Sequence, residues 1–93
     1  MKDMKKAVIS VLGEDRKGII ANVTRILYEY DVNILDISQT IISGLFTMIL
    51  IADITGEHCD FERLKESLGA LGESLNVQIR VQRSEIFDAM HRI

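Results

Sequence analysis

The sequence predicts an α+β fold in which a four-stranded antiparallel sheet carries two helices on one of its faces. Apolar residues alternate with a period of two in four segments and recur at helical spacing in two others, and these segments follow the order βαββαβ. The 93 residues, 47% of them hydrophobic and 27% charged, suit one compact core of modest size. We therefore expect residues 1–93 to form a single domain.

The first strand and the first helix are predicted in the N-terminal third of the chain. Residues 5–12 are mostly apolar in both alternating rows, which is typical of a central strand. Residues 19–30 carry apolar side chains at helical spacing, and Asp15 is placed to cap this helix. At the other end of the helix, Asp31 and Asn33 tolerate the left-handed conformation that often stops a helix.

A β-hairpin is predicted next. Residues 33–42 alternate between an apolar row and a polar row, as on an edge strand. The apolar row comprises Leu35, Ile37 and Ile41, and the polar row comprises Asp36, Ser38 and Thr40. Ser43 and Gly44 are a short turn signal, and residues 45–54 are apolar in both rows, which predicts a second central strand.

A second helix and a fourth strand follow the hairpin. Residues 61–71 show an apolar stripe at helical spacing, with Asp60 as the predicted cap and Gly72 as the predicted stop. Residues 75–83 alternate again and have one polar face, which predicts another edge strand. Beyond this strand, Ser84 is placed to cap a short C-terminal helix.

Together these elements predict the ferredoxin-like arrangement. Right-handed crossovers put both helices on one face of the sheet and give the strand order 4-1-3-2, in which the first and third strands are central. These are the two strands that are apolar on both sides. The face without helices would then expose an apolar patch, which we expect a second subunit, the C-terminal helix or both to cover. The patch comprises Val8, Leu12, Leu45, Ile49 and Ile51.

Composition and charge argue against several classes of function. Eleven basic and fourteen acidic residues give a net charge of -3, which offers no broad field for attracting nucleic acid. The lone Cys59 cannot form an intrachain disulfide, which suits a reducing cytoplasm. Its neighbours His58 and Asp60 are too close in sequence to chelate one ion with it, so we expect no metal and no cofactor. The most apolar span, residues 41–54, is too short to cross a bilayer. We therefore predict a cytoplasmic protein without membrane or nucleic-acid partners.

The segment between the first strand and the first helix is the candidate binding site. It reads Gly13-Glu14-Asp15-Arg16-Lys17-Gly18, a charged loop that is bracketed by glycines and leads into a helix start. Backbone N–H groups at a helix start can hold an anion, and glycines admit a close approach of the backbone to a ligand. Asn33 and Ile34 open the next strand, and we expect the returning chain to bring Asn33 near the loop.

This constellation resembles the ACT domain, a small regulatory module found in amino-acid metabolic enzymes. The matching stretches are residues 13–23 and 30–34, and the likeness extends over essentially the whole chain. Residues 34–40 and 86–90 are similar to the small stand-alone ACT proteins of bacteria and archaea. The chain is also similar to the ACT units of the glycine-cleavage transcriptional regulator and of formyltetrahydrofolate deformylase.

The resemblance implies a non-catalytic regulatory domain that forms a homodimer and holds an amino acid or a related small metabolite at the subunit interface. The ligand carboxylate would sit on the backbone N–H groups of residues 16–18, and the Asn33 amide would read its amino or carboxylate group. The implied ligand-binding set is Gly13, Asp15, Arg16, Lys17, Gly18, Asn33 and Ile34. A larger metabolic enzyme or regulator is a further partner that the resemblance allows.

Two departures from the family pattern bear on this expectation. Many members have proline where Lys17 stands and glycine where Asp31 stands. Lys17 adds an N–H group and a positive charge in the first helical turn, which could alter the choice of ligand. Asp31 mainly weakens the helix stop, because it adopts the left-handed conformation less readily than glycine does.

Other interpretations stay open on the sequence alone. Asp15 and Asn33 could do no more than cap helix ends. A pure interaction module would pair its exposed sheet with a larger protein and bind no metabolite. An acylphosphatase-like hydrolase shares the element order and uses an Arg and an Asn, but Glu14 would repel a phosphoryl group and Asn33 lies at the start of the second strand. An RNA-recognition domain needs aromatic and basic residues on the open face, where we expect mainly aliphatic and small polar ones.

Overall fold

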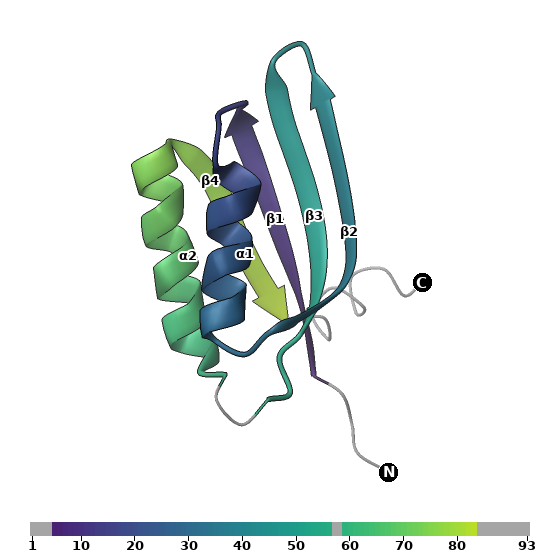
Figure 1. Cartoon of the computed structure of the whole chain (residues 1–93), viewed down its shortest axis with the longest axis vertical. Helices are drawn as coiled ribbons and strands as arrows, with labels where there is room; N and C mark the ends of the chain where they lie inside the picture. The colour runs from purple at the N-terminus through teal and green to yellow at the C-terminus, as the bar shows by residue number, and fades with distance from the viewer. Residues whose placement is uncertain (1–4, 57–58, 84–93) are drawn as a thin grey trace.

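The two helices lie side by side on one face of a four-stranded sheet (Figure 1), in a computed structural model that describes residues 5–56 and 59–83. In chain order the elements are β1 (Lys6–Glu14), α1 (Ile19–Glu29), β2 (Asn33–Ile42), β3 (Leu45–Asp53), α2 (Phe61–Leu75) and β4 (Val77–Arg83). The sheet order is β2-β3-β1-β4 and each neighbouring pair is antiparallel. The predicted fold and strand order are therefore confirmed. The C-terminal helix predicted after Ser84 lies outside the described residues.

The core lies between the helices and the sheet. One row of side chains on each central strand faces the helices, and the apolar stripes of α1 and α2 pack against these rows. The largest side chains that are fully buried there are Ile9, Val11, Ile19, Val23, Leu27, Met48, Leu50, Leu64 and Leu68. The opposite rows of β1 and β3 face away from the helices, because side chains alternate along a strand.

Helix α1 ends as the sequence predicts, at a left-handed aspartate. Asp31 has a φ of 60°, and its N–H donates to the Tyr28 carbonyl at 3.1 Å, while the Val32 N–H donates to the Leu27 carbonyl at 2.9 Å. These two bonds satisfy carbonyls that the helix itself leaves without partners. Asn33 is not part of this stop, since it already belongs to β2.

Helix α2 begins as predicted but ends later. The Asp60 side chain accepts a hydrogen bond from the Arg63 N–H at 3.3 Å, so its role as the cap is confirmed. The prediction that Gly72 stops the helix is wrong: α2 continues to Leu75, and Asn76 takes the left-handed conformation, with a φ of 59°. Gly72 is buried against β4 and serves a close approach between the helix and that strand.

The β2–β3 hairpin contains the predicted turn and an irregularity that the alternation did not predict. Ser43 and Gly44 both have positive φ values, 51° and 79°, as a two-residue hairpin turn requires. In the strand register, Ile34 is opposite Ala52 and Asp36 is opposite Ile51. Leu35 is the extra residue of a β-bulge between them, so the prediction that it shares a row with Ile37 and Ile41 is wrong.

Candidate functional site

The loop between β1 and α1 forms one end of the molecule. The Asp15 N–H donates to the Gly44 carbonyl at 2.9 Å, which joins this loop to the tip of the β2–β3 hairpin. Gly18 has a φ of 88° and is the residue that precedes the helix. Within the described residues α1 has no side-chain cap, so the prediction that Asp15 caps it is wrong. The start of α1 therefore offers backbone N–H groups beside the exposed Arg16 and Lys17.

Asn22 also lies at this end of the molecule, and it was not among the predicted binding residues. Its side-chain amide donates to the Gly18 carbonyl at 2.7 Å, and the Asn22 backbone N–H donates to the same carbonyl at 2.9 Å. The Asn22 side-chain oxygen accepts from Arg25 at 3.3 Å. The signal in the sequence was an asparagine four residues after a glycine at a helix start, the spacing of one helical turn. Asn22 thus fixes the carbonyl of the residue at which the helix begins.

Gly13 lies inside β1 and not in the loop. A Cβ atom at this position would lie 2.6 Å from Cγ1 and 2.9 Å from Cβ of Val77, its partner across the sheet. The space that a side chain would need is therefore filled by Val77. Gly13 serves the packing of β1 against β4 at this point.

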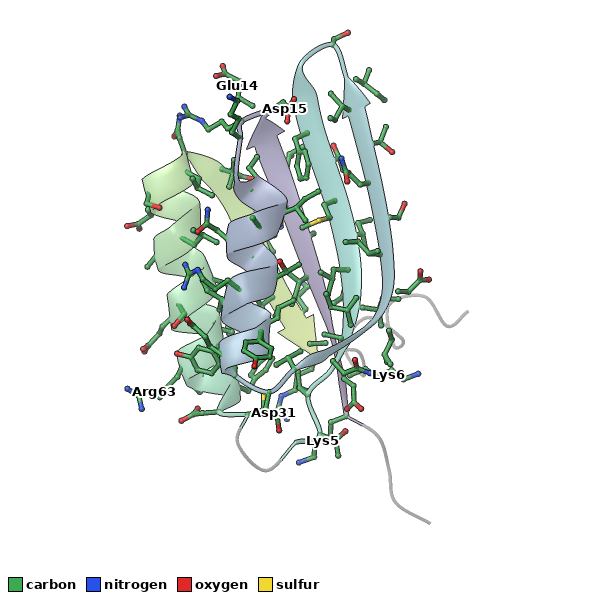
Figure 2. All side chains as sticks on the ribbon, viewed as in Figure 1. Lys5, Lys6, Glu14, Asp15, Asp31 and Arg63 are labelled. Atoms are coloured by element: carbon green, nitrogen blue, oxygen red, sulfur yellow. The ribbon has the colours of Figure 1, made fainter. Side chains whose placement is uncertain are left out.

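Asn33 and Ile34 lie at the opposite end of the sheet from the loop. Asn33 is exposed and pairs with Asp53, which in turn pairs with Lys6 on β1. Thr55 hydrogen bonds hold the pKa of the Asp53 carboxyl below its usual value, with a smaller contribution from Lys6. Figure 2 shows Asp15 at one end of the molecule and Lys6 and Asp31 at the other. Ile34 is half-buried and packs against the core.

The expectation that the returning chain brings Asn33 near the loop is therefore wrong for a single chain. Glu14 pairs with Leu45 and Asn33 pairs with Asp53, so the two ends are eight residue steps apart along β3. At 3.4 Å per residue this separation is about 27 Å. Helix α1 carries the chain from one end of the sheet to the other before β2 begins.

The face without helices carries much of the predicted apolar patch. Leu12, Leu45 and Ile49 are 43%, 47% and 48% exposed, and Ile51 is half-buried. Val8 is only 7% exposed, so its predicted exposure is wrong; it sits in central strand β1 between Ile51 and Gln82 of the neighbouring strands. A shallow hollow of about 290 Å³ opens on this face. Its lining includes Ser10, Leu12, Thr47, Ile49, Gln78 and Arg80.

Strand β2 adds a second exposed apolar region. It is an edge strand in the described part of the chain, and nine of its ten residues are exposed. Four of these are large and apolar: Leu35, Ile37, Ile41 and Ile42. A long apolar edge presents backbone N–H and C=O groups that another strand can pair with. This edge is therefore suited to association.

Cys59 lies between the β3–α2 loop and the core. Burial raises the pKa of its thiol, and the carboxylates of Asp60, Asp31 and Asp53 raise it further. Such a thiol is a poor nucleophile at neutral pH, because the thiolate is the reactive form. In residues 5–56 and 59–83, no group of three or more His, Cys, Asp or Glu residues could hold a metal ion.

We predict that Cys59 is alkylated more slowly than an ordinary thiol. Because its pKa is raised, the rate of iodoacetamide reaction should reach half of its maximum at a higher pH in the folded chain than in the same chain unfolded in urea. Mass spectrometry of quenched time points measures both profiles. If the midpoint pH of alkylation in the folded chain were equal to or below that in the unfolded chain, burial and the nearby carboxylates would not raise the pKa of Cys59.

A sequence profile described as the ACT domain matches residues 5–82. The chain belongs to the ACT domain family. A UPF0237 protein of Methanocaldococcus jannaschii is 50% identical over 90 residues, which cover 97% of this chain and 100% of that protein. ACT domains are typically regulatory modules that bind small molecules.

Solved structures agree with this family assignment. An ACT domain protein from Streptococcus pneumoniae is 39% identical, with a TM-score of 0.79, and the match covers 96% of this chain and 100% of that one. A putative glycine cleavage system transcriptional repressor has a TM-score of 0.77 at 23% identity, over 88% of this chain and 47% of its own. A formyltetrahydrofolate deformylase from Pseudomonas syringae has a TM-score of 0.79 at 22% identity, over 89% and 28%. The last two likenesses show the ACT fold alone.

None of the helices in the described ranges of this ACT chain is long and apolar enough to span a membrane.

Proposed function

We propose that this ACT chain is a non-catalytic regulatory module that binds an amino acid or a related small metabolite between two copies of itself. The observation that carries the proposal is the hydrogen bond from the Asp15 N–H to the Gly44 carbonyl. This bond joins the loop before α1, where we propose that an anion binds, to the hairpin tip at which the exposed β2 edge finishes. The other end of the same edge begins with Asn33.

A two-fold axis would unite the two separated halves of the candidate site. If the β2 edges of two copies pair antiparallel, Asn33 of one copy lies opposite the Ile42 end of its partner. Ile42 immediately precedes the hairpin tip that holds the partner's loop. Two identical composite sites result, each made of a loop from one chain and an asparagine from the other. The loop and Asn33 are about 27 Å apart within one chain, but in this dimer each loop lies near the Asn33 of the other chain.

The chemistry of such a composite site suits a zwitterion. The start of α1 has backbone N–H groups and the positive end of the helix dipole, with Arg16 and Lys17 alongside, which favours a carboxylate. The Asn33 amide has both donors and an acceptor, so it can bind an ammonium group or the second carboxylate oxygen. To act as a regulator, the ligand must bind one arrangement of the subunits better than another.

The exposed apolar residues support association between copies. Strand β2 and the open face together leave several large aliphatic side chains in solvent, and a second copy would bury them. We propose that the interface involves the β2 edge and continues onto the open face at Leu12, Leu45, Ile49 and Ile51, with Val8 beneath them. A larger enzyme or regulator could occupy the open face in place of a second copy.

The first experiment is a thermal-shift panel of the twenty amino acids with purine and folate intermediates. A ligand at about 100 times its dissociation constant adds about 2.7 kcal/mol to the stability of the chain that binds it. A hit should be weakened both by Asn33→Ala and by Arg16→Glu. Absence of any hit would favour the interaction module, for which the exposed β2 edge is the supporting observation.

Mixing the two variants tests whether the site is shared. In a mixed dimer of Asn33→Ala and Arg16→Glu chains, one site receives an intact loop and an intact asparagine, and the other site receives neither. We expect ligand binding to return at about a quarter of all sites when the two inactive variants are mixed and re-equilibrated. Calorimetry measures the number of sites. Loss of binding in both variants without recovery on mixing would contradict a shared site.

The positions of Arg16 and Asn33 do not support the acylphosphatase-like hydrolase. Its mechanism would need an arginine and an asparagine at one phosphoryl group, whereas Arg16 follows the Glu14 end of β1 and Asn33 begins β2 at the opposite end of the sheet. The carboxylates of Glu14 and Asp15 also lie beside Arg16 and would repel a phosphoryl group.

A further inference from the structure

The open face of the sheet, which is the side without helices, has a protruding side chain directly beside a hollow. Figure 1 views the molecule from the other side, with the helices in front of the sheet. Ile49 of β3 is 48% exposed, and its cross-strand partner on β1 is the much smaller Ser10. The hollow of about 290 Å³ lies where Ser10 is surrounded by the longer side chains of Leu12, Ile49 and Arg80. Its volume exceeds that of one isoleucine side chain.

The two margins of the open face carry opposite charges. Asp36 of edge strand β2 and Arg80 of edge strand β4 are both exposed. Both point away from the helices, because residues directly opposite each other share a face and their cross-strand partners are Ile51 and Ser10. Within the part of the chain that the structure describes, neither belongs to an ion pair of 4 Å or less. The face thus has a carboxylate at one margin and a guanidinium at the other, each without a charged partner.

A two-fold axis parallel to the strands, midway between β1 and β3, would match these features of two copies. Rotation about this axis reverses the strand order, so β3 faces the partner's β1 and β4 faces the partner's β2. Ile49 then enters the hollow over the partner's Ser10. Arg80 lies opposite the partner's Ser38, one position on the same face away from the partner's Asp36. Packed sheets usually keep their strand directions within about 30° of each other, which this axis provides.

The other two-fold axis that lies between two such faces does not suit them. An axis perpendicular to the strands brings each strand onto the same strand of the partner. Arg80 would then lie opposite the partner's Arg80, and the two guanidinium groups would repel each other. Ile49 would meet the partner's Ile49, so that two protrusions collide and both hollows stay empty. Charge and shape therefore favour the axis parallel to the strands.

We propose that two copies of this chain pack open face to open face about the axis parallel to the strands. Each Ile49 fills the hollow of the other copy, and each Arg80 pairs with the other copy's Asp36. The face is about 19 Å wide across four strands and about 31 Å long over the nine residues of β1. Two such faces together cover about 1,200 Å², which reaches the lower end of the area of specific, stable interfaces.

Face pairing supplies a second arrangement of the subunits, and this step rests on the proposed function. Antiparallel pairing of two β2 edges has its axis perpendicular to the sheet, and it leaves both open faces on one side of a continuous sheet. That axis does not meet the axis between β1 and β3, so a chain that made both contacts would assemble without closing. The two dimers are therefore alternatives, and the contact at the open face belongs to the face-paired one. A ligand that needs Asn33 at the β2 edge would draw chains out of face-paired dimers.

Sedimentation equilibrium of the full chain, without any ligand, tests face pairing. Arg80→Asp and Asp36→Arg should each raise the dimer dissociation constant by about tenfold or more, because each homodimer then brings like charges together at two places. A mixed dimer of the two variants has opposite charges at both places. We therefore expect the dissociation constant of an equimolar mixture to return to within about threefold of the wild-type value. Arg80 lies on the strand farthest from the β2 edge, so its effect cannot come from edge pairing.

Filling the hollow is a second test that changes no charge. Ser10→Leu should weaken the dimer by about tenfold or more, because the new side chain occupies the space of the partner's Ile49. The control Ser10→Ala keeps that space and should change the dissociation constant less than about twofold. A wild-type chain that is monomeric at its highest soluble concentration, no recovery on mixing the charge variants, or equal effects of the two Ser10 variants would overturn the proposal. Each of these results leaves the metabolite site standing, and a thermal-shift panel without a hit leaves face pairing standing.

Discussion

Replacing Leu50 by alanine should lower the free energy of unfolding by about 2–5 kcal/mol. Leu50 is 0% exposed and lies on β3 between Ile9 of β1 and Ile37 of β2, in the row that faces the helices. The truncation removes buried methyl groups and leaves a cavity that the surrounding sheet and helices fill only in part. A domain of this size is typically stable by about 5–15 kcal/mol, so the loss is a large share of the total. Urea unfolding followed by circular dichroism measures it.

The control for Leu50 is the preceding residue on the same strand. Ile49 points to the opposite face and is 48% exposed, so Ile49→Ala in a monomer should cost less than about 1.5 kcal/mol. If two copies cover the open face, the cost of Ile49→Ala grows with protein concentration, because association is linked to folding. The cost of Leu50→Ala has no such dependence on the open face. Equal costs for the two variants at a concentration where the chain is monomeric would contradict the assignment of the two faces.

The fold could be predicted because apolar periodicity decides it. The two rows of β1 and β3 are both apolar, which only the central strands of this sheet require, and right-handed crossovers then leave one strand order. Helix stops and caps were predictable where one residue acts on its own neighbours. Asp60 bonding to Arg63 and Asp31 adopting a left-handed conformation are local events of this kind.

The errors concern residues whose role depends on a distant partner. Asp15 was predicted to cap α1, but its backbone N–H donates a hydrogen bond to the Gly44 carbonyl of the hairpin. Gly18 is instead the residue that precedes the helix. A β-bulge at Leu35 changes the alternation of side chains within β2, and no local feature of the sequence predicts it. Proximity in sequence also misled the prediction for Asn33, because an intervening helix of 11 residues is about 16 Å long and carries the chain to the far end of the sheet.

The predicted binding residues form two groups that only the dimer proposal reunites. Arg16, Lys17 and Gly18 precede a helix start that has no side-chain cap in the described chain, which is compatible with the proposed anion site. Gly13 instead makes room for Val77. The family resemblance implied a set of binding residues but not which chain supplies each of them. That assignment needs the distance between the two ends of one chain.

Gly72 and Gly69 of helix α2 should respond in opposite directions to the same substitution. A Cβ atom at Gly69 would meet no atom within 4 Å, so Gly69→Ala should stabilise the chain by up to about 1 kcal/mol through helix propensity alone. A Cβ atom at Gly72 would lie 2.8 Å from the Val77 carbonyl oxygen and 3.3 Å from Cγ1 of Ile79. Gly72→Ala gains the same propensity, but it must push the helix away from β4.

Helix α2 cannot easily move away from β4, because the connection between these two elements is very short. Asn76 alone joins Leu75, the last residue of α2, to Val77, the first of β4, so the strand folds back directly beside the last helical turn. Overpacking of this kind typically costs about 1–3 kcal/mol, and the two alanine variants should differ in unfolding free energy by about that amount. Urea titrations of both variants under the same conditions give the difference. If Gly72→Ala were as stable as Gly69→Ala, then Gly72 would be needed neither for helix packing nor for the tight turn into β4.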